Sequence, residues 1–121
     1  MKIENIHFQN KQIPYDYLET LFNGLKEIAS FPLMEPTQKI KNKYPNINVE
    51  SRDIYVKAIP NSILYTVIDC GHDPKEKSTL AVNCKGYAIV DIKKGKLMPV
   101  PKLEKIIEMM DLQVGSDLIE D

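Results

Sequence analysis

Residues 52–70, RDIYVKAIPNSILYTVIDC, contain two apolar segments separated by the Pro-Asn-Ser sequence at residues 60–62. Residues 52–59 are rich in β-branched and aromatic residues, and residues 63–70 are apolar on both sides of an extended chain. Proline, asparagine and serine together are typical of a turn. The stretch therefore predicts a hairpin whose second strand is central in a sheet, because a central strand buries both of its sides.

Three further strands are expected downstream of this hairpin. After a polar loop at residues 71–78, they span residues 79–84, 87–93 and 96–100 and are separated by Lys-Gly turns. Glycine supplies the positive φ that a two-residue hairpin loop needs. Pro99 lacks the N–H group of a central strand residue, so the last strand belongs at an edge of the sheet. The whole segment is thus predicted to be an antiparallel meander.

One amphipathic helix is expected before the meander in the sequence, and a second one after it. Between Pro14 and Pro32, apolar residues recur at spacings of three and four and so form one helical face; they are Leu18, Leu21, Phe22, Leu25, Ile28 and Ala29. Pro101 suits the first turn of the second helix, whose apolar face holds Leu103, Ile106, Ile107 and Met110. Near the N-terminus, Ile6 and Phe8 alternate with polar neighbours, which predicts a short first strand.

Residues 31–51 are the least regular part of the sequence, because prolines and asparagines interrupt them. Thr37 either caps a short helix that runs to Tyr44 or lies in a loop. No linker or internal repeat divides the chain, and 121 residues suit one domain. We therefore predict a single α+β domain over residues 1–121. It has a four- to five-stranded antiparallel meander sheet with two main helices packed on one face.

The composition is that of an ordinary globular protein, with 43% apolar and 27% charged residues. The first residues contain an acid and no apolar run, so they do not resemble a signal peptide. The most continuous apolar stretch, residues 63–68, is far too short to span a membrane. We therefore expect a cytoplasmic protein whose two cysteines are reduced.

Both cysteines and one of the two histidines fall within fifteen residues, as Cys70, His72, Asp73 and Cys84. A structural zinc site needs four ligands, which usually come as two close pairs. The expected hairpin instead separates Cys84 from Cys70 by about five residues, or roughly 16 Å, whereas a disulfide needs Cα atoms within ~7 Å. We therefore predict no metal site, and we expect Cys84 to be a small buried core residue.

A nucleophilic pair of Cys70 and His72 is the other chemical possibility in this stretch. A reactive thiol needs positive surroundings or a helix N-terminus, but Asp69 and Asp73 flank the pair and would oppose formation of a thiolate. Phosphate-loop, dinucleotide-binding, zinc-protease and nucleophile-elbow motifs are absent from the sequence. The sequence therefore indicates no catalytic residue and no cofactor, and an enzyme is disfavoured.

Charge is unevenly distributed along the chain, although its net value is only −1. Residues 36–49 contain three lysines and no acid, whereas residues 108–121 contain five acids and no base. Such segregation steers a partner of opposite charge. The chain has fifteen lysines, but Arg52 is its one arginine. Because arginine is preferred for binding phosphate and guanine, nucleic-acid binding is disfavoured.

These features favour a protein-binding domain, in particular a small bacterial inhibitor of the immunity or antitoxin type. Such a domain blocks a basic partner, for example a nuclease toxin, through acidic side chains that also raise the association rate. The candidate partner-binding residues are Glu104, Glu108, Asp111, Asp117, Glu120 and Asp121, together with His72 and Asp73 in the polar loop. The alternatives are a small enzyme without a sequence signature and an assembly subunit that pairs through a sheet edge.

Overall fold

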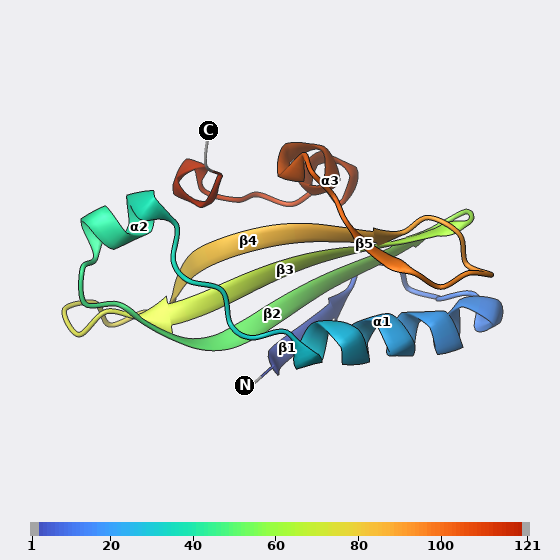
Figure 1. The fold of residues 1–121 in the computed structure, drawn as a ribbon, viewed down its shortest axis with the longest axis horizontal. Helices are drawn as coiled ribbons and strands as arrows, with labels where there is room; N and C mark the ends of the chain where they lie inside the picture. The colour runs from blue at the N-terminus through green and yellow to red at the C-terminus, as the bar shows by residue number, and fades with distance from the viewer. Residues whose placement is uncertain (1–2, 120–121) are drawn as a thin grey trace.

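Within the described residues, the fold is built on a sheet of five strands that follow one another in chain order (Figure 1). The computed structural model describes residues 3–119, and the side chains of residues 5–119. The strands are β1 (Ile3–Phe8), β2 (Asn48–Ile59), β3 (Ser62–His72), β4 (Leu80–Ile89) and β5 (Leu97–Pro99). The helices are α1 (Leu18–Ser30), α2 (Gln38–Lys43) and α3 (Leu103–Met109), with two short 3-10 helices, η1 (Tyr15–Tyr17) and η2 (Ser116–Leu118). The predicted α+β class is therefore confirmed.

β2 and β3 form the hairpin that the sequence predicts. Ile59 pairs with Ser62, and Asn61 between them has a φ of 64°, which asparagine tolerates better than most residues. β3 pairs with β4 and β4 with β5, antiparallel in each case, and β5 with its Pro99 lies at an edge. The antiparallel meander predicted for residues 52–100 is thus confirmed as β2 to β5, except that the two strands expected at residues 79–84 and 87–93 are the single strand β4.

Two glycines of the meander lie inside strands and not in turns. The turn expected at Gly86 is absent, because β4 is continuous there and a Cβ at this position would overlap the Ile106 side chain of α3. β3 likewise extends to His72, so Gly71 belongs to the strand and not to the loop. A Cβ on Gly71 would overlap the Asn48 carbonyl group of β2. In both places glycine permits a close contact between elements.

β1 corrects the predicted topology, because it pairs with β2 in parallel. The sheet is therefore mixed and not wholly antiparallel. The reason lies in the connection: α1 stands between β1 and β2 in the chain, and a helical crossover starts the next strand in the same direction as the first. The alternation of Ile6 and Phe8 indicates a strand but carries no information about its direction.

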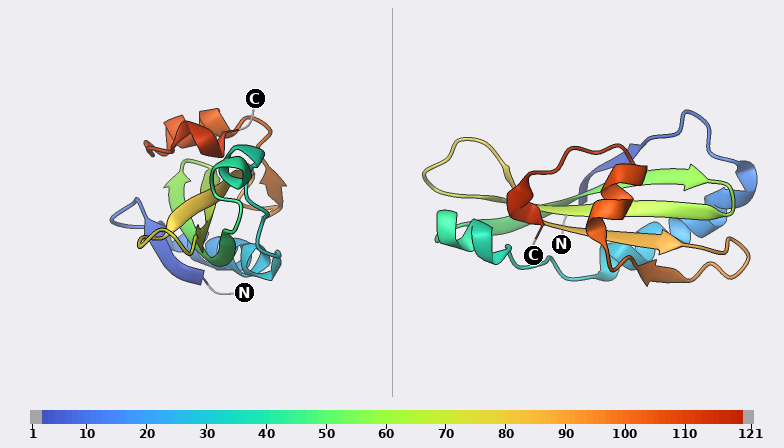
Figure 2. Two further views of the ribbon diagram at one scale, coloured as in Figure 1. Left: turned by 90° about the vertical axis from the view of Figure 1, so that its left-hand side faces the viewer. Right: turned by 90° about the horizontal axis from the view of Figure 1, so that it is seen from above.

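The main helices lie on opposite faces of the sheet, not on one face as predicted (Figures 1 and 2). On the α1 face, the helix packs its apolar side against Ile54, Val56, Ile63, Tyr65, Val67 and Ile89. On the α3 face, α3 and η2 share a cluster with Leu64, Val82, Cys84 and Ala88. Successive strand residues point to opposite faces, and β3 is apolar on both sides. Each face therefore needs its own cover.

Residues 31–51 contain α2, so the short-helix alternative is correct. The Thr37 hydroxyl accepts a hydrogen bond from the Ile40 N–H at 3.3 Å, as an N-cap residue does. The same hydroxyl donates to the Asp117 carbonyl at 2.7 Å and so connects α2 to η2. Ile40 and Leu118 are buried together in the cluster of the α3 face.

Candidate functional site

The one arginine of the chain is buried on the α1 face. Arg52 is 1% exposed and Asp69, its partner, is 0% exposed. The two residues lie directly opposite each other in β2 and β3. Their ion pair is bidentate, with Nε to Oδ1 at 2.6 Å and Nη2 to Oδ2 at 2.8 Å. In this geometry neither buried charge is left uncompensated.

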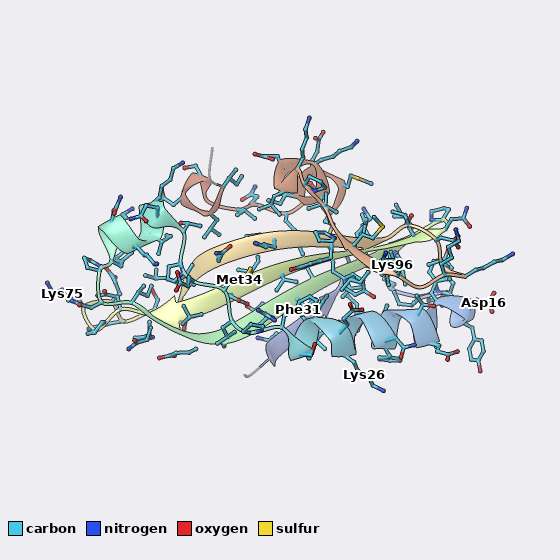
Figure 3. The ribbon with its side chains drawn as sticks, viewed as in Figure 1. Asp16, Lys26, Phe31, Met34, Lys75 and Lys96 are labelled. Atoms are coloured by element: carbon cyan, nitrogen blue, oxygen red, sulfur yellow. The ribbon has the colours of Figure 1, made fainter. Side chains whose placement is uncertain are left out.

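The other guanidinium donors hold the C-terminal end of α1 and the segment that follows it. Nη1 donates to the carbonyls of Ile28 and Phe31, and Nη2 donates to that of Pro32. The Met34 N–H donates to the carboxylate of the ion pair at 2.7 Å. The segment that contains Phe31 and Met34 (Figure 3) is therefore attached to the sheet. Because all five N–H groups of the guanidinium are used within the protein, we assign the ion pair a structural role.

The sequence neighbours of this ion pair form a pocket on the α3 face. Ser51 and Asp53 flank the arginine in β2, and Cys70 follows the aspartate in β3, so their side chains leave the other side of the sheet. The cavity has a volume of about 350 Å³ and is named here the Asp53 pocket. It is lined by Asn5, Glu50, Ser51, Asp53, Cys70 and Thr79.

Two oxygen atoms of this pocket lack a hydrogen-bond partner among the described residues. Asp53 Oδ1 is buried and has none, whereas Asp53 Oδ2 lies 3.9 Å from the Cys70 sulfur. Ser51 is 7% exposed, and no hydrogen bond is formed by its hydroxyl within the described part of the chain. The lining therefore contains two acceptor oxygens that no described donor uses, one of the Asp53 carboxylate and one of the Ser51 hydroxyl.

An aromatic pair adjoins the pocket on the same face. His7 of β1 stacks on Tyr55 of β2, with the ring centroids 4.4 Å apart and the planes inclined by 13°. Burial raises the pKa of the Tyr55 hydroxyl above its usual value, and the nearby Asp53 and Cys70 raise it further. Among the described residues, no partner is found for the buried Nε2 of His7. Sequence reasoning missed this cluster, because its members come from three strands.

Three of the predicted partner-binding acids lie together on the surface. Glu104 and Glu108 are exposed on α3, and Asp111 is exposed just beyond its end, with a φ of 54°. Lys105 is exposed on the same helix. No ion pair involves the three acids within the part of the chain that the structure describes.

The remaining acids of the C-terminal segment are partly neutralised from within the chain or lie outside the described residues. Asp117 is 3.7 Å from the Lys43 ammonium of α2, and Lys39 donates to the Ile119 carbonyl at 3.3 Å. The basic stretch and the acidic stretch of the sequence are thus neighbours in space. Glu120 and Asp121 lie outside the described residues.

The two loop residues proposed for partner binding differ in accessibility. His72 ends β3 and is partly exposed. Asp73 is only 4% exposed. Its carboxylate accepts a hydrogen bond from the Lys75 N–H at 2.8 Å, and its carbonyl accepts one from the Glu76 N–H at 2.9 Å. Asp73 therefore shapes the turn between β3 and β4.

The two cysteines are closer in register than the sequence predicts. Cys84 lies opposite Ile68, two positions from Cys70 along β3, because Cys70 pairs with Ala81 and a bulge shifts the ladder. Cys84 is 4% exposed and packs in the cluster of the α3 face, which confirms the core interpretation. Within the described part of the chain, no three His, Cys, Asp or Glu side chains are placed to hold a metal ion.

Cys84 is expected to resist alkylation in the folded protein. Burial, followed by the nearby Asp69, raises the pKa of its thiol to about 12, and the thiolate is the reactive form. Mass spectrometry of a Cys70→Ser variant treated with iodoacetamide at about pH 8 should show labelling only after urea is added. Rapid labelling of the folded variant would contradict the assignment.

The chain matches no protein-family model, and searches of curated proteins and of solved structures find no match either. Within residues 3–119, none of the helices is long and apolar enough to cross a membrane. The functional interpretation therefore depends on the surface charges and on the Asp53 pocket.

Proposed function

We propose that the domain binds a basic protein partner through its α3 face. The exposure of Glu104, Glu108 and Asp111 along one helix and its end supports this proposal. The helix buries Ile106 and Ile107 against the sheet, so its polar side points outward. The three carboxylates share this side with the exposed Lys105, and the exposed Lys85 and Lys102 line a cavity beside Glu104.

The Asp53 pocket contributes further acidic groups. It lies on the same face of the sheet and adds the carboxylates of Glu50 and Asp53. A concentrated negative surface attracts a basic partner during encounter and raises the association rate. Inhibitors of the immunity or antitoxin type act in this way when they cover the basic surface of a nuclease, and this is the class of function that we propose.

Charge reversal on α3 is expected to abolish partner capture. The domain is immobilised and exposed to an extract of the cells that produce it, and retained proteins are eluted with a salt gradient. The triple variant Glu104→Lys, Glu108→Lys and Asp111→Lys should lose the basic proteins that the parent retains. Parent complexes should dissociate as salt rises, because exposed charges are screened.

The matched control places the same charge change on the α1 side. Asp16, Glu19 and Glu27 are exposed near or on α1, and their replacement by lysine should leave capture intact. Equal loss in both triple variants would mean that net charge alone governs retention. Retention by the α3 variant of every protein that the parent binds would contradict the proposal.

A sheet edge supports a second candidate, namely an assembly subunit. β1 forms an edge of the sheet, and its Ile6 and Phe8 side chains are 41% and 46% exposed. An edge strand with exposed apolar residues can pair with a strand of another protein. In the capture experiment, a complex that is insensitive to salt and is lost on Phe8→Ser would favour this function over the first.

A further inference from the structure

We infer that the Asp53 pocket binds a protonated amine. The inference concerns a site of small-molecule size and stands on the pocket alone. The amine can belong to a free ligand or to a lysine side chain, and only the lysine source rests on the proposed function. In both cases the chemistry recognised is an ammonium group with its N–H donors.

The acceptors of the pocket are already in place. Asp53 Oδ1 is buried without a hydrogen-bond partner among the described residues, and a buried polar atom in that state is costly unless a donor reaches it. Ser51, two residues earlier in the same strand, presents a hydroxyl from a residue that is 7% exposed. Asn5 of β1 also lines the pocket, and its side-chain amide contains a further acceptor oxygen. An ammonium group carries three donors and matches such a set.

The charge of the lining selects a cation. Glu50 and Asp53 are carboxylates, and among the described residues neither lysine nor arginine lines the pocket. An anion would be repelled. Ca²⁺ and Mg²⁺ take six or more oxygen ligands, and within the described residues no three acidic, histidine or cysteine side chains are grouped to hold a metal. An ammonium group needs fewer charged ligands, because its donors are satisfied by neutral oxygens as well.

The pocket is rigidly supported from the other side of the sheet. Arg52 lies between Ser51 and Asp53, and its bidentate ion pair with Asp69 fixes β2 against β3 directly behind the cavity. The Cys70 thiol lies 3.9 Å from Asp53 Oδ2, and Oδ1 is buried and without a hydrogen-bond partner among the described residues. The acceptors are therefore held in position before a ligand arrives, which reduces the entropy cost of binding.

The test is a titration of the full chain with n-butylammonium chloride, followed by backbone amide NMR. We expect saturable shifts at Ser51, Asp53 and Cys70. Tetramethylammonium chloride, which has the charge but no N–H donor, should give no saturable shifts at these residues. A parallel titration with Nα-acetyl-lysine methylamide separates the sources. Binding of this compound assigns the pocket to a lysine side chain as well, and binding of butylammonium alone assigns it to a free amine.

Two variants connect the binding to the acceptors. Asp53→Asn keeps the shape of the side chain and removes its charge, and it should weaken butylammonium binding by roughly tenfold, as expected for loss of a charge-assisted hydrogen bond. Ser51→Ala tests the second acceptor and should weaken binding by a smaller factor. Glu27→Gln is the matched control, because Glu27 is exposed on α1, and this variant should bind butylammonium like the parent.

Several results would overturn the inference. They are the absence of saturable shifts with either amine, shifts confined to other residues, and equal affinity of the parent and both pocket variants. The same shifts on addition of CaCl₂ or sodium phosphate would assign the pocket to a different ligand. Amide spectra of the unliganded variants establish that they are folded, so a failure to bind can be read directly. This outcome is independent of the α3 capture experiment.

Discussion

Asp69→Ala is expected to lower the free energy of unfolding by about 3–5 kcal/mol, which is the cost of leaving a buried charge without its partner. Arg52 is 1% exposed, so water cannot take the place of the lost carboxylate. The substitution also removes the acceptor of the Met34 N–H. Because a typical domain has a stability of only about 5–15 kcal/mol, the variant should lose a large fraction of its stability.

Urea denaturation followed by circular dichroism measures this effect. Glu27→Ala removes an exposed carboxylate from α1 and should change stability by less than about 0.5 kcal/mol. The double variant Arg52→Met, Asp69→Leu removes both buried charges and should be more stable than Asp69→Ala. A stability of Asp69→Ala within about 1 kcal/mol of the parent would show that the ion pair is dispensable.

Gly71→Ala is expected to destabilise the domain by about 2–3 kcal/mol, the upper part of the range of about 1–3 kcal/mol that is typical of overpacking. A Cβ at this position would overlap the Asn48 carbonyl group and would stand 3.2 Å from the Val49 Cα. These are backbone atoms of β2, so no side-chain rotation relieves the overlap. The strands would have to separate next to the bulge between Val49 and Ser51.

Gly115→Ala is the matched control for this substitution. Nothing lies within 4 Å of a Cβ built there, and the residue has a φ of −61° that alanine adopts readily. Its stability should stay within about 0.5 kcal/mol of the parent or rise slightly, because alanine restricts the unfolded chain. Equal urea midpoints for the two variants would show that the close contact with Asn48 leaves room for a methyl group at residue 71.

Local pattern was sufficient to predict most of the sheet. The apolar run at residues 63–70, with turn residues before it and a polar loop after it, identified a central strand and its hairpin partner. The direction of β1 and the placement of the helices on two faces depend on contacts far apart in sequence. The sequence predicts a turn at Gly86, because a Lys-Gly pair looks the same in a turn as in a strand where glycine makes room for the Ile106 side chain.

The candidate site was less accessible from sequence. A lone Arg52 and an Asp69 within an apolar strand were signals of a buried ion pair, since such a strand tolerates an acid only when it is paired. The Asp53 pocket gathers residues from β1, β2, β3 and the following loop, and it required the register of the sheet. The acids of the C-terminal segment were identified, but the pairing of Asp117 with Lys43 required the packing of α2 beside η2.

The side chains of Ser51, Arg52 and Asp53 point to alternate faces of the sheet. This alternation also affects which register β2 and β3 adopt during folding. β3 is apolar on both sides, so its Ile63 and Leu64 would be buried in either of two alignments that differ by one residue. A shift by one residue reverses the side to which every residue of β2 points. It would carry Arg52 away from Asp69 and bury two unmatched charges, at several kcal/mol for each ion. The ion pair thus favours the same alignment as the apolar side of β2, where Ile54 and Val56 are buried.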